Sequence, residues 1–376
     1  MKVSFNNLYE QWLTIKDKAL TDLDNLFYRS DFILGKDVDK FEQKFSKFLD
    51  IPYAVGVSNG TDALKLAALA LEPKGSTLVV IPANTYIATI FGIDNAVPGA
   101  DFMLIDCDQY YQLDTDKLSD VLSTHSQNYS TIIVVCVHLY GYTCDMHKIT
   151  AICNKHNAWL IEDVSQAHGA KAYNKYAGTF GHVSAFSLYP GKNLGCAGDG
   201  GVIVTPHQYI YDRLLPLRNL GSIKKYHHIV KGYNHRLDSL QAIILNHKLD
   251  YLEEWNSKRR QIVNRLESSI SNEHVKLPAT PSYCVPIHHI YPVLTNNKEH
   301  FQTYLTVNNI EYGMHYPIPI EITPMYQHLR DHTSNKNTIN YCNTATSLPM
   351  HPFLKTEEVD YMIDTINKYN PFISIV

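Results

Sequence analysis

The chain has 376 residues, of which 45% are hydrophobic and 19% are charged, and its formal net charge at pH 7 is −4. This length predicts a large domain with a smaller one, and the slightly acidic balance argues against a nucleic-acid-binding protein, which needs a basic surface. No apolar stretch is long enough to span a bilayer, and the N-terminus MKVSFNNLYEQW lacks the apolar core of a signal peptide.

Hydrophobic periodicity predicts a chain in which strands and helices alternate. Residues 38–49 place apolar side chains at helical spacing. Further helices are predicted over 61–71, 86–95 and 145–157. Short apolar runs of the strand type lie between them, at 53–57, 77–81, 101–106, 131–137, 158–163, 183–189 and 201–205. This alternation favours a mostly parallel sheet with helices on both faces.

The pattern changes near residue 237, where one long helical stretch is predicted to run to about residue 270. We expect it to lead from a large domain at 1–236, which begins with a helical arm, into a smaller domain at 237–376. The smaller domain is predicted to contain a strand near 287–295, a helix near 298–307 and a last helix near 356–369.

The seven cysteines are dispersed along the chain and form no CxxC pair. We therefore expect free thiols in a reducing, cytoplasmic compartment and no zinc site. The 19 histidines are also dispersed, and the pairs His227–His228 and His288–His289 have no partners at metal-ligand spacing. No metal is predicted.

The segment SNGTDAL (58–64) follows a predicted strand and opens a predicted helix. Gly60 would let the backbone approach a ligand closely, and the N–H groups of Gly60, Thr61 and Asp62 at a helix start would suit a phosphate. The segment also fits an ordinary N-cap formed by Ser58 or Thr61. Taken alone, it fits the ordinary cap better.

A carboxylate and a lysine follow two later strands. Asp163 ends the strand at 158–163, where it could hold a proton on a pyridine nitrogen or cap the next turn. Lys192 lies in SLYPGKNLGCAGDGG, where a lysine amine of lowered pKa could bond to an aldehyde, although most such lysines are simply solvated. Ser187 could donate its hydroxyl to a phosphate. Five glycines would let the backbone turn tightly around a flat ring: Gly191, Gly195, Gly198, Gly200 and Gly201.

The chain contains a phosphate loop, an aspartate and a lysine in this order, each at the end of a strand. This arrangement resembles that of the fold-type I enzymes that depend on pyridoxal phosphate. Six segments further resemble the DegT/DnrJ/EryC1/StrS family of nucleotide-sugar aminotransferases: SNGTDALKLAALAL, PANTYIATI, VHLYGYTCDM, LIEDVSQAHGA, SLYPGKNLGCAGDGG and GYNHRLDSLQAIIL. The resemblance extends from residue 32 to residue 320. It implies a large domain with a mostly parallel, mixed seven-stranded sheet, a smaller C-terminal α+β domain, and a homodimer with shared active sites.

The resemblance also implies a role for each matching residue. Lys192 would form a Schiff base with pyridoxal phosphate and, once freed, act as the general base. Asp163 would partner the pyridine nitrogen, and Gln166 would lie against the phenolic oxygen of the ring. Tyr86 would stack on the ring face, although a lone aromatic residue after a strand is usually part of a core.

Other matching residues would hold the phosphate or the substrate. The phosphate would be bound by Gly60, Thr61, Ser187 and, from the other subunit, Asn234. The substrate would meet Tyr189, His315 and Tyr316, but the last two fit aromatic packing in a proline-rich loop equally well.

The implied reaction moves an amino group from glutamate to a keto-sugar nucleotide. GKNLGCAGDGG and residues 221–238 resemble the branch that aminates C3 of a dTDP-3-keto-6-deoxyhexose, whereas the C4 branch more often has Glu-Gly at Asp199–Gly200. The alternatives are a 4-aminotransferase for a UDP-, dTDP- or GDP-4-keto-6-deoxysugar, and a non-catalytic homologue that binds the cofactor. A dinucleotide-dependent dehydrogenase is disfavoured because VSNGTDA lacks GxGxxG.

Overall fold

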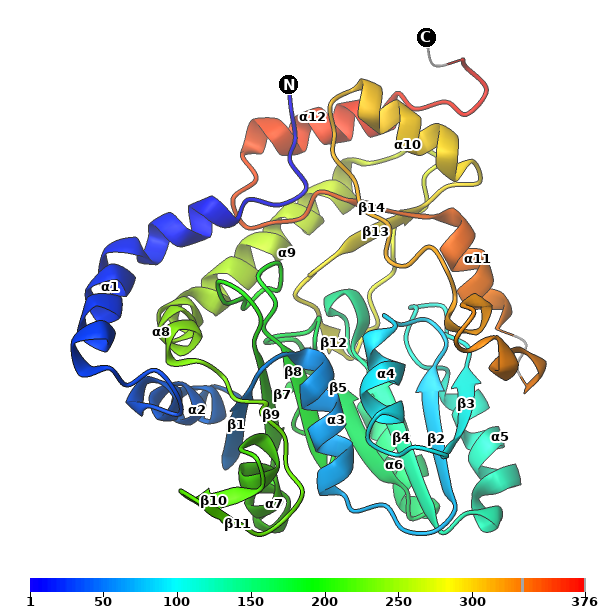
Figure 1. Ribbon diagram of the computed structural model, residues 1–376. Coiled ribbons are helices and arrows are strands. Elements are labelled where there is room, and N and C mark those ends of the chain that lie inside the picture. Colours follow the sequence, from blue (N-terminus) through cyan, green and yellow to red (C-terminus); the bar gives the residue numbers. More distant parts are fainter. Residues whose placement is uncertain (333–334, 375–376) are drawn as a thin grey trace.

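The computed structural model describes residues 1–332 and 335–374. Its centre is a sheet of seven strands: β1 (Tyr53–Val57), β2 (Thr77–Pro82), β3 (Asp101–Ile105), β4 (Thr131–Val137), β5 (Trp159–Asp163), β8 (Val183–Ser187) and β9 (Gly201–Thr205). Their order across the sheet is β1-β9-β8-β5-β4-β2-β3 (Figure 1). β9 runs antiparallel to both of its neighbours, and the other neighbouring pairs are parallel. The predicted mostly parallel, mixed sheet is confirmed.

Helices cover both faces of this sheet because alternate apolar side chains of each strand point to opposite sides. The covering helices are α2 (Lys36–Leu49), α3 (Gly60–Ala70), α4 (Ala88–Asp94), α5 (Thr115–His125), α6 (Met146–Lys155), α7 (Gln208–Arg218) and α8 (Ser239–Lys248). One face packs against α3, α4 and α7. The other packs against α5 and α6 at one end and against α2 and α8 at the other.

The N-terminal helix α1 (Leu8–Arg29) extends away from the sheet and lies on α8 (Figure 1). Its contact with α8 is a small apolar cluster of Ile15, Ala19 and Ile244. Short strands lie outside the main sheet: β6 (Lys171–Ala172), β7 (Lys175–Tyr176), β10 (Ser222–Lys224), β11 (His227–His228) and β12 (Cys284–Val285).

The C-terminal part has its own core above the carboxyl ends of the parallel strands (Figure 1). Its elements are α9 (Leu252–Ser269), β13 (Tyr291–Leu294), α10 (Lys298–Val307), α11 (Lys336–Thr344), β14 (Ala345–Leu348) and α12 (Thr356–Asn367). β13 and β14 pair antiparallel. The chain start joins this core, because Val3 is fully buried there and bridges to Ile310. The boundary at residues 236 and 237 stays a prediction.

The prediction of a single helix from 237 to 270 is wrong, because the segment forms two α-helices, α8 and α9. They are joined by the 3₁₀ turn η3 (Leu249–Tyr251). Leu245 and Leu249 pack in the core beneath the main sheet, whereas Val263 and Leu266 pack in the C-terminal core. A 3₁₀ turn has three residues per turn, so it rotates the apolar stripe from one core to the other.

All seven cysteines are free and buried, as the dispersed pattern predicted. Within residues 1–332 and 335–374, no helix combines the length and the apolarity needed to cross a membrane. In the same residues, no group of three or more His, Cys, Asp or Glu side chains is arranged to hold a metal ion.

A buried ion pair joins α2 and α7 to the edge strand β1. The guanidinium of Arg218 donates to the carboxylate of Glu42, and its Nη1 also donates to the carbonyl of Gly56 (2.9 Å). Glu42 Oε1 accepts the N–H of Gly56 (2.7 Å). Both side chains are buried, where an unpaired charge would be costly. The positive charge of Arg218 therefore compensates the negative charge of Glu42, and the reverse.

Arg218→Ala should therefore lower the free energy of unfolding by about 3–5 kcal/mol, because it leaves the Glu42 carboxylate buried without its partner. Urea unfolding followed by circular dichroism measures this change. Arg265→Ala is the matched control, since Arg265 pairs with Asp360 on the surface and the loss should be at most about 1 kcal/mol. Equal losses in the two variants would contradict the role of the buried pair.

Candidate functional site

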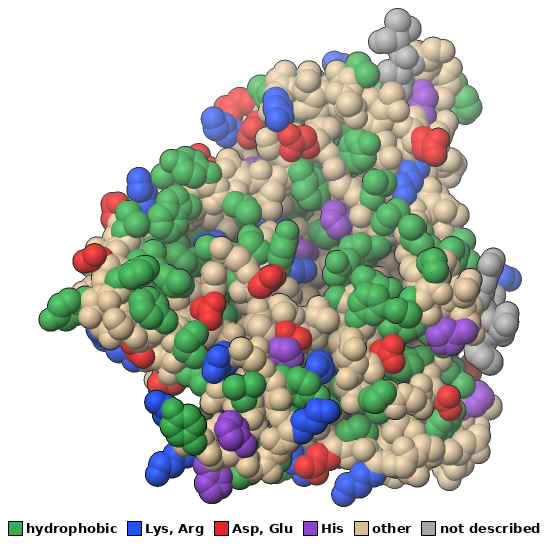
Figure 2. Space-filling model, viewed as in Figure 1, with side chains coloured by type: hydrophobic (Ala, Val, Ile, Leu, Met, Phe, Trp, Pro, Cys, Tyr) green, Lys and Arg blue, Asp and Glu red, His purple; other side chains and the backbone are tan. Residues whose placement is uncertain are grey.

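The predicted site residues gather at the carboxyl edge of the main sheet. Asp163 ends β5, Ser187 ends β8, and the α3 helix begins just after β1. Ligands of open α/β sheets bind at this edge. Figure 2, in the same view as Figure 1, shows a hollow near the middle of this face, with histidine and basic side chains at its bottom.

Asp163 is fixed by hydrogen bonds and is only 3% exposed. Its Oδ2 accepts the hydroxyl of Thr89 (2.9 Å), which also contacts the hydroxyl of Thr85 (2.8 Å). Its Oδ1 accepts the N–H of Ser165 (3.0 Å). The carboxylate is thus held at one orientation at the end of β5. Thr89 was missed in the sequence, because a threonine inside a helical pattern gives no signal of its partner.

The start of α3 lies against the end of β8. A Cβ added at Gly60 would lie 2.5 Å from the Cβ of Ser187, so only glycine permits this approach. The N-cap is Asn59, whose Oδ1 accepts the N–H of Asp62 (2.8 Å). Two expectations are therefore corrected: Ser58 and Thr61 do not cap the helix, and the N–H of Asp62 is not free for a phosphate. The N–H groups of Gly60 and Thr61 remain at the helix start, where no helical acceptor exists.

Lys192 lies in the loop that follows β8, and its side chain is partly buried. Burial lowers the pKa of Lys192 to about 8, and the charge of Asp163 opposes that change. Because a neutral amine is needed to attack an aldehyde, this environment favours the chemistry predicted for it. Asp163 and Lys192, which are 29 positions apart in sequence, are thus close enough to interact.

The glycines around Lys192 act by close approach. None of the five predicted glycines in this loop, all of which the structure describes, has a left-handed φ. Gly195 is required for another reason, since a Cβ there would lie 2.4 Å from the carbonyl oxygen of Pro190. The carbonyl of Gly195 accepts the Nζ of Lys248 (2.7 Å), which ties the loop to α8.

A chain of amides fixes the residue after Lys192. Asn193 Nδ2 donates to Asn256 Oδ1 (2.8 Å) on α9 and to the carbonyl of Ile287 (3.2 Å), and Asn256 Nδ2 donates to the carbonyl of His168 (2.9 Å). Asn193 Oδ1 must then accept the Nδ1–H of His289 (2.9 Å). This chain connects the lysine loop, the C-terminal part and the segment after β5.

Three histidines lie close enough to Lys192 for its charge to affect them. Burial first, and Lys192 second, lower the pKa of His168 to about 3 and that of His315 to about 4, and they also lower the pKa of His289. All three rings are therefore neutral near pH 7. His168 and His289 were not predicted as site residues, since dispersed histidines carry no spacing signal.

Gln166 links the sheet to the C-terminal part. Its Oε1 accepts the N–H of Tyr140 (2.7 Å), and its Nε2 donates to the hydroxyl of Tyr316 (2.7 Å). The ring of Tyr316 lies 5.1 Å from that of Tyr86, and Tyr86 itself is 52% exposed. The structure thus brings Tyr86, Gln166 and Tyr316 together, and Tyr86 is not part of a core.

The predicted substrate residues reach the same region from two directions. Tyr140 donates its hydroxyl to the carbonyl of His315 (2.7 Å), and the ring Nδ1 of His315 lies 2.9 Å from Ser347 Oγ. Tyr189, in the lysine loop, is 58% exposed. Tyr316 is thus bonded to the predicted site residue Gln166, whereas the partners of His315 are Tyr140 and Ser347.

Asn234 is exposed, and its neighbour His235 faces the start of α3 in the same chain. His235 Nδ1 lies 3.1 Å from Asp62 Oδ2, and its ring stacks on Tyr233 at 5.2 Å. These contacts hold the segment 233–235 in place and leave the side chain of Asn234 at the surface.

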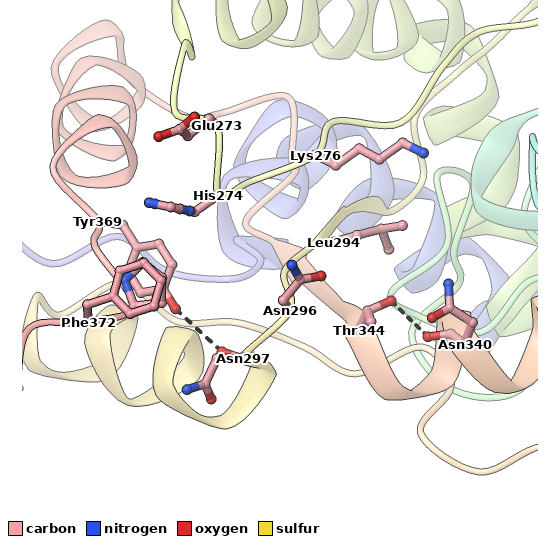
Figure 3. A pocket seen from close by; sticks show the side chains of 11 residues that line it. Glu273, His274, Lys276, Leu294, Asn296, Asn297, Asn340, Thr344, Tyr369 and Phe372 are labelled. Atoms are coloured by element: carbon pink, nitrogen blue, oxygen red, sulfur yellow. Dashed lines mark hydrogen bonds between the residues drawn. The ribbon is translucent and has the colours of Figure 1, made fainter.

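A separate cavity of about 620 Å³ lies in the C-terminal part (Figure 3). Figure 3 shows Lys276, Asn296 and Asn297 among the side chains around it. None of the described residues that line it is a predicted site residue, so it is distinct from the site at the sheet edge.

The groups at the sheet edge fit pyridoxal phosphate. The helix start at Gly60 and Thr61, with the Ser187 hydroxyl beside it, is a cradle that a Cβ at Gly60 would fill. The buried Asp163 carboxylate suits a protonated pyridine nitrogen, and Lys192 suits the aldehyde.

Comparisons with known proteins agree with this geometry. The model of the DegT/DnrJ/EryC1/StrS aminotransferase family matches residues 14–367. The dTDP-3-amino-3,6-dideoxy-alpha-D-galactopyranose transaminase of Aneurinibacillus thermoaerophilus is 39% identical over 90% of this chain and 91% of its own length. GDP-perosamine synthase of Escherichia coli O157:H7 is 31% identical over 96% of this chain and 98% of its own.

A solved structure shows the same fold. The crystal structure of S. venezuelae DesV, determined in complex with a ketimine intermediate, superimposes with a TM-score of 0.92 at 30% identity and covers 98% of both chains. The family match spans most of the sequence, and the Aneurinibacillus relative is named a transaminase of a dTDP-amino sugar. The chain therefore belongs to the DegT/DnrJ/EryC1/StrS aminotransferase family and is an enzyme of the pyridoxal-phosphate-dependent sugar transaminase class.

Proposed function

We propose that this enzyme uses pyridoxal phosphate to move an amino group from glutamate to a dTDP-3-keto-6-deoxyhexose, giving a dTDP-3-amino-3,6-dideoxyhexose. The observation that carries the aminotransferase chemistry is the pairing of Lys192, whose pKa is lowered to about 8, with the fixed carboxylate of Asp163. Fold alone would not support an activity, but these two side chains supply the groups that the chemistry needs.

When bound, pyridoxal phosphate supplies an aldehyde that bonds to amines and a ring that takes up the electron pair left when a C–H bond breaks. The protein's part is to place charges and protons. Lys192, as a neutral amine, would take a proton from the donor's Cα and return it in the reverse direction. Asp163, unable to turn away because Thr89 and Ser165 hold both its oxygens, would keep the ring nitrogen protonated.

The other residues proposed to contact the cofactor are assigned from their positions at the carboxyl edge of the sheet. Gly60, Thr61 and Ser187 would bind the phosphate, Tyr86 would stack on the ring, and Gln166 would face the phenolic oxygen. The hydrogen bond from Gln166 Nε2 to Tyr316 supports the last assignment, because it places this amide between the sheet edge and the residues proposed for the substrate.

Two observations support a dTDP-3-keto-6-deoxyhexose as the substrate. The Aneurinibacillus transaminase, at 39% identity, is named for a dTDP-3-amino sugar, and Asp199–Gly200 is the pair expected of the C3 branch. The GDP-sugar relative at 31% identity favours a second candidate, a 4-aminotransferase for a UDP-, dTDP- or GDP-4-keto-6-deoxysugar. Tyr189, His315 and Tyr316 would contact the sugar nucleotide in either case.

A homodimer with shared sites is part of the proposal. Large apolar side chains are exposed on α1 and on the β10–β11 hairpin: Tyr9, Phe27, Tyr28, Ile223 and Tyr226. Figure 2 shows hydrophobic side chains gathered where Figure 1 draws α1. Tyr28 is 92% exposed and Tyr226 is 84% exposed, and such surfaces mark interaction sites. In the proposed dimer, these surfaces would be covered by a second copy, and Asn234 of one subunit would bind the phosphate held by the other.

The seven free thiols support a reducing compartment, and we propose the cytoplasm. The lowered pKa of Lys192 argues against a non-catalytic homologue, since mere binding of the cofactor does not require a reactive amine.

The first test is the absorption spectrum of the purified protein with pyridoxal phosphate, before and after glutamate is added. Glutamate should convert the visible band of the bound cofactor to that of its amino form, and a 3-keto dTDP-sugar should restore it. In Lys192→Ala the conversion should slow by at least about 1000-fold, because general acid–base catalysis is lost together with the covalent anchor.

A panel of acceptors decides the substrate. Restoration of the band by 4-keto sugars alone would support the second candidate over the first. A band that glutamate does not change would leave the protein as a non-catalytic binder.

The reactivity of Lys192 should follow its pKa. Only the neutral amine reacts with trinitrobenzenesulfonate, so labelling of Lys192 in the apoprotein should rise with pH and reach half of its maximum near pH 8. A free lysine derivative, with a pKa of about 10.4, should reach it more than two pH units higher. Mass spectrometry of the labelled peptide measures the site-specific rate.

The Asp163→Asn variant tests the sign of the interaction. Asp163 raises the pKa of Lys192 against the larger effect of burial, so its removal should move the labelling midpoint below pH 8. A midpoint that moves upward, or stays in place, would contradict the contact between the two groups.

Asn234 can be assigned to a subunit by mixing two variants. Asn234→Ala should bind pyridoxal phosphate about tenfold more weakly, because a hydrogen bond to a charged phosphate is lost. In a mixed dimer with Lys192→Ala, the intact Lys192 site would receive the intact Asn234 of its partner and regain normal affinity. If Asn234 served its own chain instead, mixing would restore nothing.

A further inference from the structure

We propose that Glu162 is a positioning residue: its buried carboxylate, together with His138, fixes Asp163 and Gln166, the two groups assigned to the nitrogen and the phenolic oxygen of the cofactor ring. This inference rests on the proposed function for the roles of Asp163 and Gln166. It adds Glu162 and His138 to the residues on which that function depends, although neither would touch the cofactor or the substrate.

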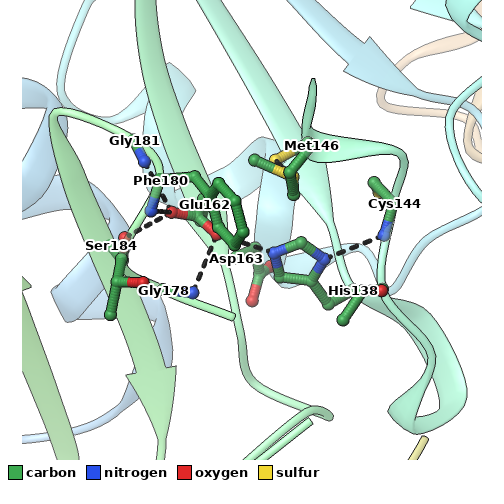
Figure 4. A network of polar contacts seen from close by, with 12 residues as sticks. His138, Cys144, Met146, Glu162, Asp163, Gly178, Phe180, Gly181 and Ser184 are labelled. Carbon is green, nitrogen blue, oxygen red and sulfur yellow. Dashed lines mark hydrogen bonds and ion pairs between the residues drawn. The ribbon is translucent and has the colours of Figure 1, made fainter. Parts of the chain in front are cut away.

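The carboxylate of Glu162 is fully buried, and both its oxygens are occupied (Figure 4). Oε2 accepts from His138 Nε2 (2.9 Å) and from the N–H of Gly178 (2.8 Å). Oε1 accepts the N–H groups of Phe180 (2.7 Å) and Gly181 (2.6 Å), and more weakly the hydroxyl of Ser184 (3.3 Å). Burial alone would raise the pKa of Glu162, but these hydrogen bonds outweigh it and lower the pKa, so the group is a fixed anion.

The backbone transmits this constraint to Asp163. Glu162 and Asp163 are neighbours in β5, so their side chains point to opposite faces of the sheet. The backbone N–H of His138 donates to the carbonyl of Asp163 (3.0 Å), while the ring of His138 holds the carboxylate of Glu162. His138 therefore forms hydrogen bonds with both Glu162 and Asp163 at the end of β5. A shift of Glu162 would move the Cα of Asp163 with it.

The same histidine fixes the turn that holds Gln166. The N–H of Cys144 donates to His138 Nδ1 (3.1 Å), which closes the segment 138–144 onto the ring (Figure 4). Within this segment lies Tyr140, whose φ of +61° is unfavourable for a residue other than glycine and must be imposed by its surroundings. In that conformation the N–H of Tyr140 points at Gln166 Oε1 (2.7 Å).

The protonation state of the ring follows from these contacts. Burial lowers the pKa of His138, whereas Cys144 and Glu162 raise it, and these charges by themselves would favour a protonated ring. A charged ring would carry a proton on both nitrogens, but Nδ1 already accepts the N–H of Cys144. We therefore assign a neutral ring with its proton on Nε2, donated to Glu162. Glu162 then keeps its negative charge on the face of β5 opposite Asp163.

Two substitutions of His138 separate its two contacts. His138→Gln can keep a donor near the position of Nε2, toward Glu162. His138→Asn can keep an acceptor near the position of Nδ1, toward Cys144, but it leaves the Glu162 carboxylate without this donor. We expect His138→Asn to bind pyridoxal phosphate about tenfold more weakly and to shift its absorption maximum. His138→Gln, which keeps the donor toward Glu162 but loses the acceptor toward Cys144, should lose less affinity than His138→Asn, and the control Ser184→Ala should stay within about threefold of the wild type.

Hydrogen exchange of the apoprotein gives a readout that needs no cofactor. In His138→Asn, the peptides containing 163–166 and 178–181 should lose protection, whereas in His138→Gln the peptide containing 138–144 should lose it. A peptide from α12 should keep its protection in both variants. Loss confined to 178–181, or a lower melting temperature with unchanged cofactor affinity and spectrum, would show a merely structural role and overturn the proposal. If the wild type itself binds no pyridoxal phosphate, the proposed function fails, and the exchange pattern alone decides this inference.

A measurement on the wild type tests the proposal even if the variants do not fold. The nitrogen chemical shifts of His138 at pH 7 should show a neutral ring protonated at Nε2. A ring protonated at Nδ1, or at both nitrogens, would break the link from Cys144 and overturn the assignment.

Discussion

Two adjacent carboxylates end the central strand β5, and the rest of the site depends on how each is compensated. Their side chains lie on opposite faces of the sheet, out of contact with bulk water, so each needs its own set of donors. Glu162 is satisfied by the protein alone, through three backbone N–H groups, a histidine and a serine. Within residues 1–332 and 335–374, the hydrogen-bond donors to the carboxylate of Asp163 are only Thr89 and Ser165. The difference marks Asp163 as the carboxylate with capacity left for a ligand.

The charge on Lys192 affects the histidines that lie near it in the site. An ammonium that is partly withdrawn from water becomes less favourable. The histidines beside it remain neutral first because they are buried, and second because another positive charge would be repelled by that of Lys192. Neutral imidazoles can accept or donate hydrogen bonds without competing with Lys192 for a counter-ion. The close approach at Gly195 keeps the lysine loop tight, and Asn193 ties it to α9.

The sequence predicted most of what depends on local pattern. Apolar runs located the seven strands of the sheet, and the position of Asp163 and Lys192 after two of them placed both at one edge. What it could not predict depends on partners far apart in the chain. Thr89, Asn193 and His168 are ordinary residues until folding brings their partners to them. The N-cap was misassigned for a similar reason, since Ser58, Asn59 and Thr61 are all acceptable capping types and only geometry selects Asn59.

The residues proposed for the substrate are not independent of those proposed for the cofactor. Tyr140 uses its N–H to hold Gln166 and its hydroxyl to hold the carbonyl of His315, while Gln166 itself bonds to Tyr316. Gln166 and Tyr140 come from the sheet, and His315 and Tyr316 come from the C-terminal part. One short set of hydrogen bonds thus joins both sides of the site. A movement of the C-terminal part would therefore act directly on the Gln166 amide, which is proposed to face the cofactor ring.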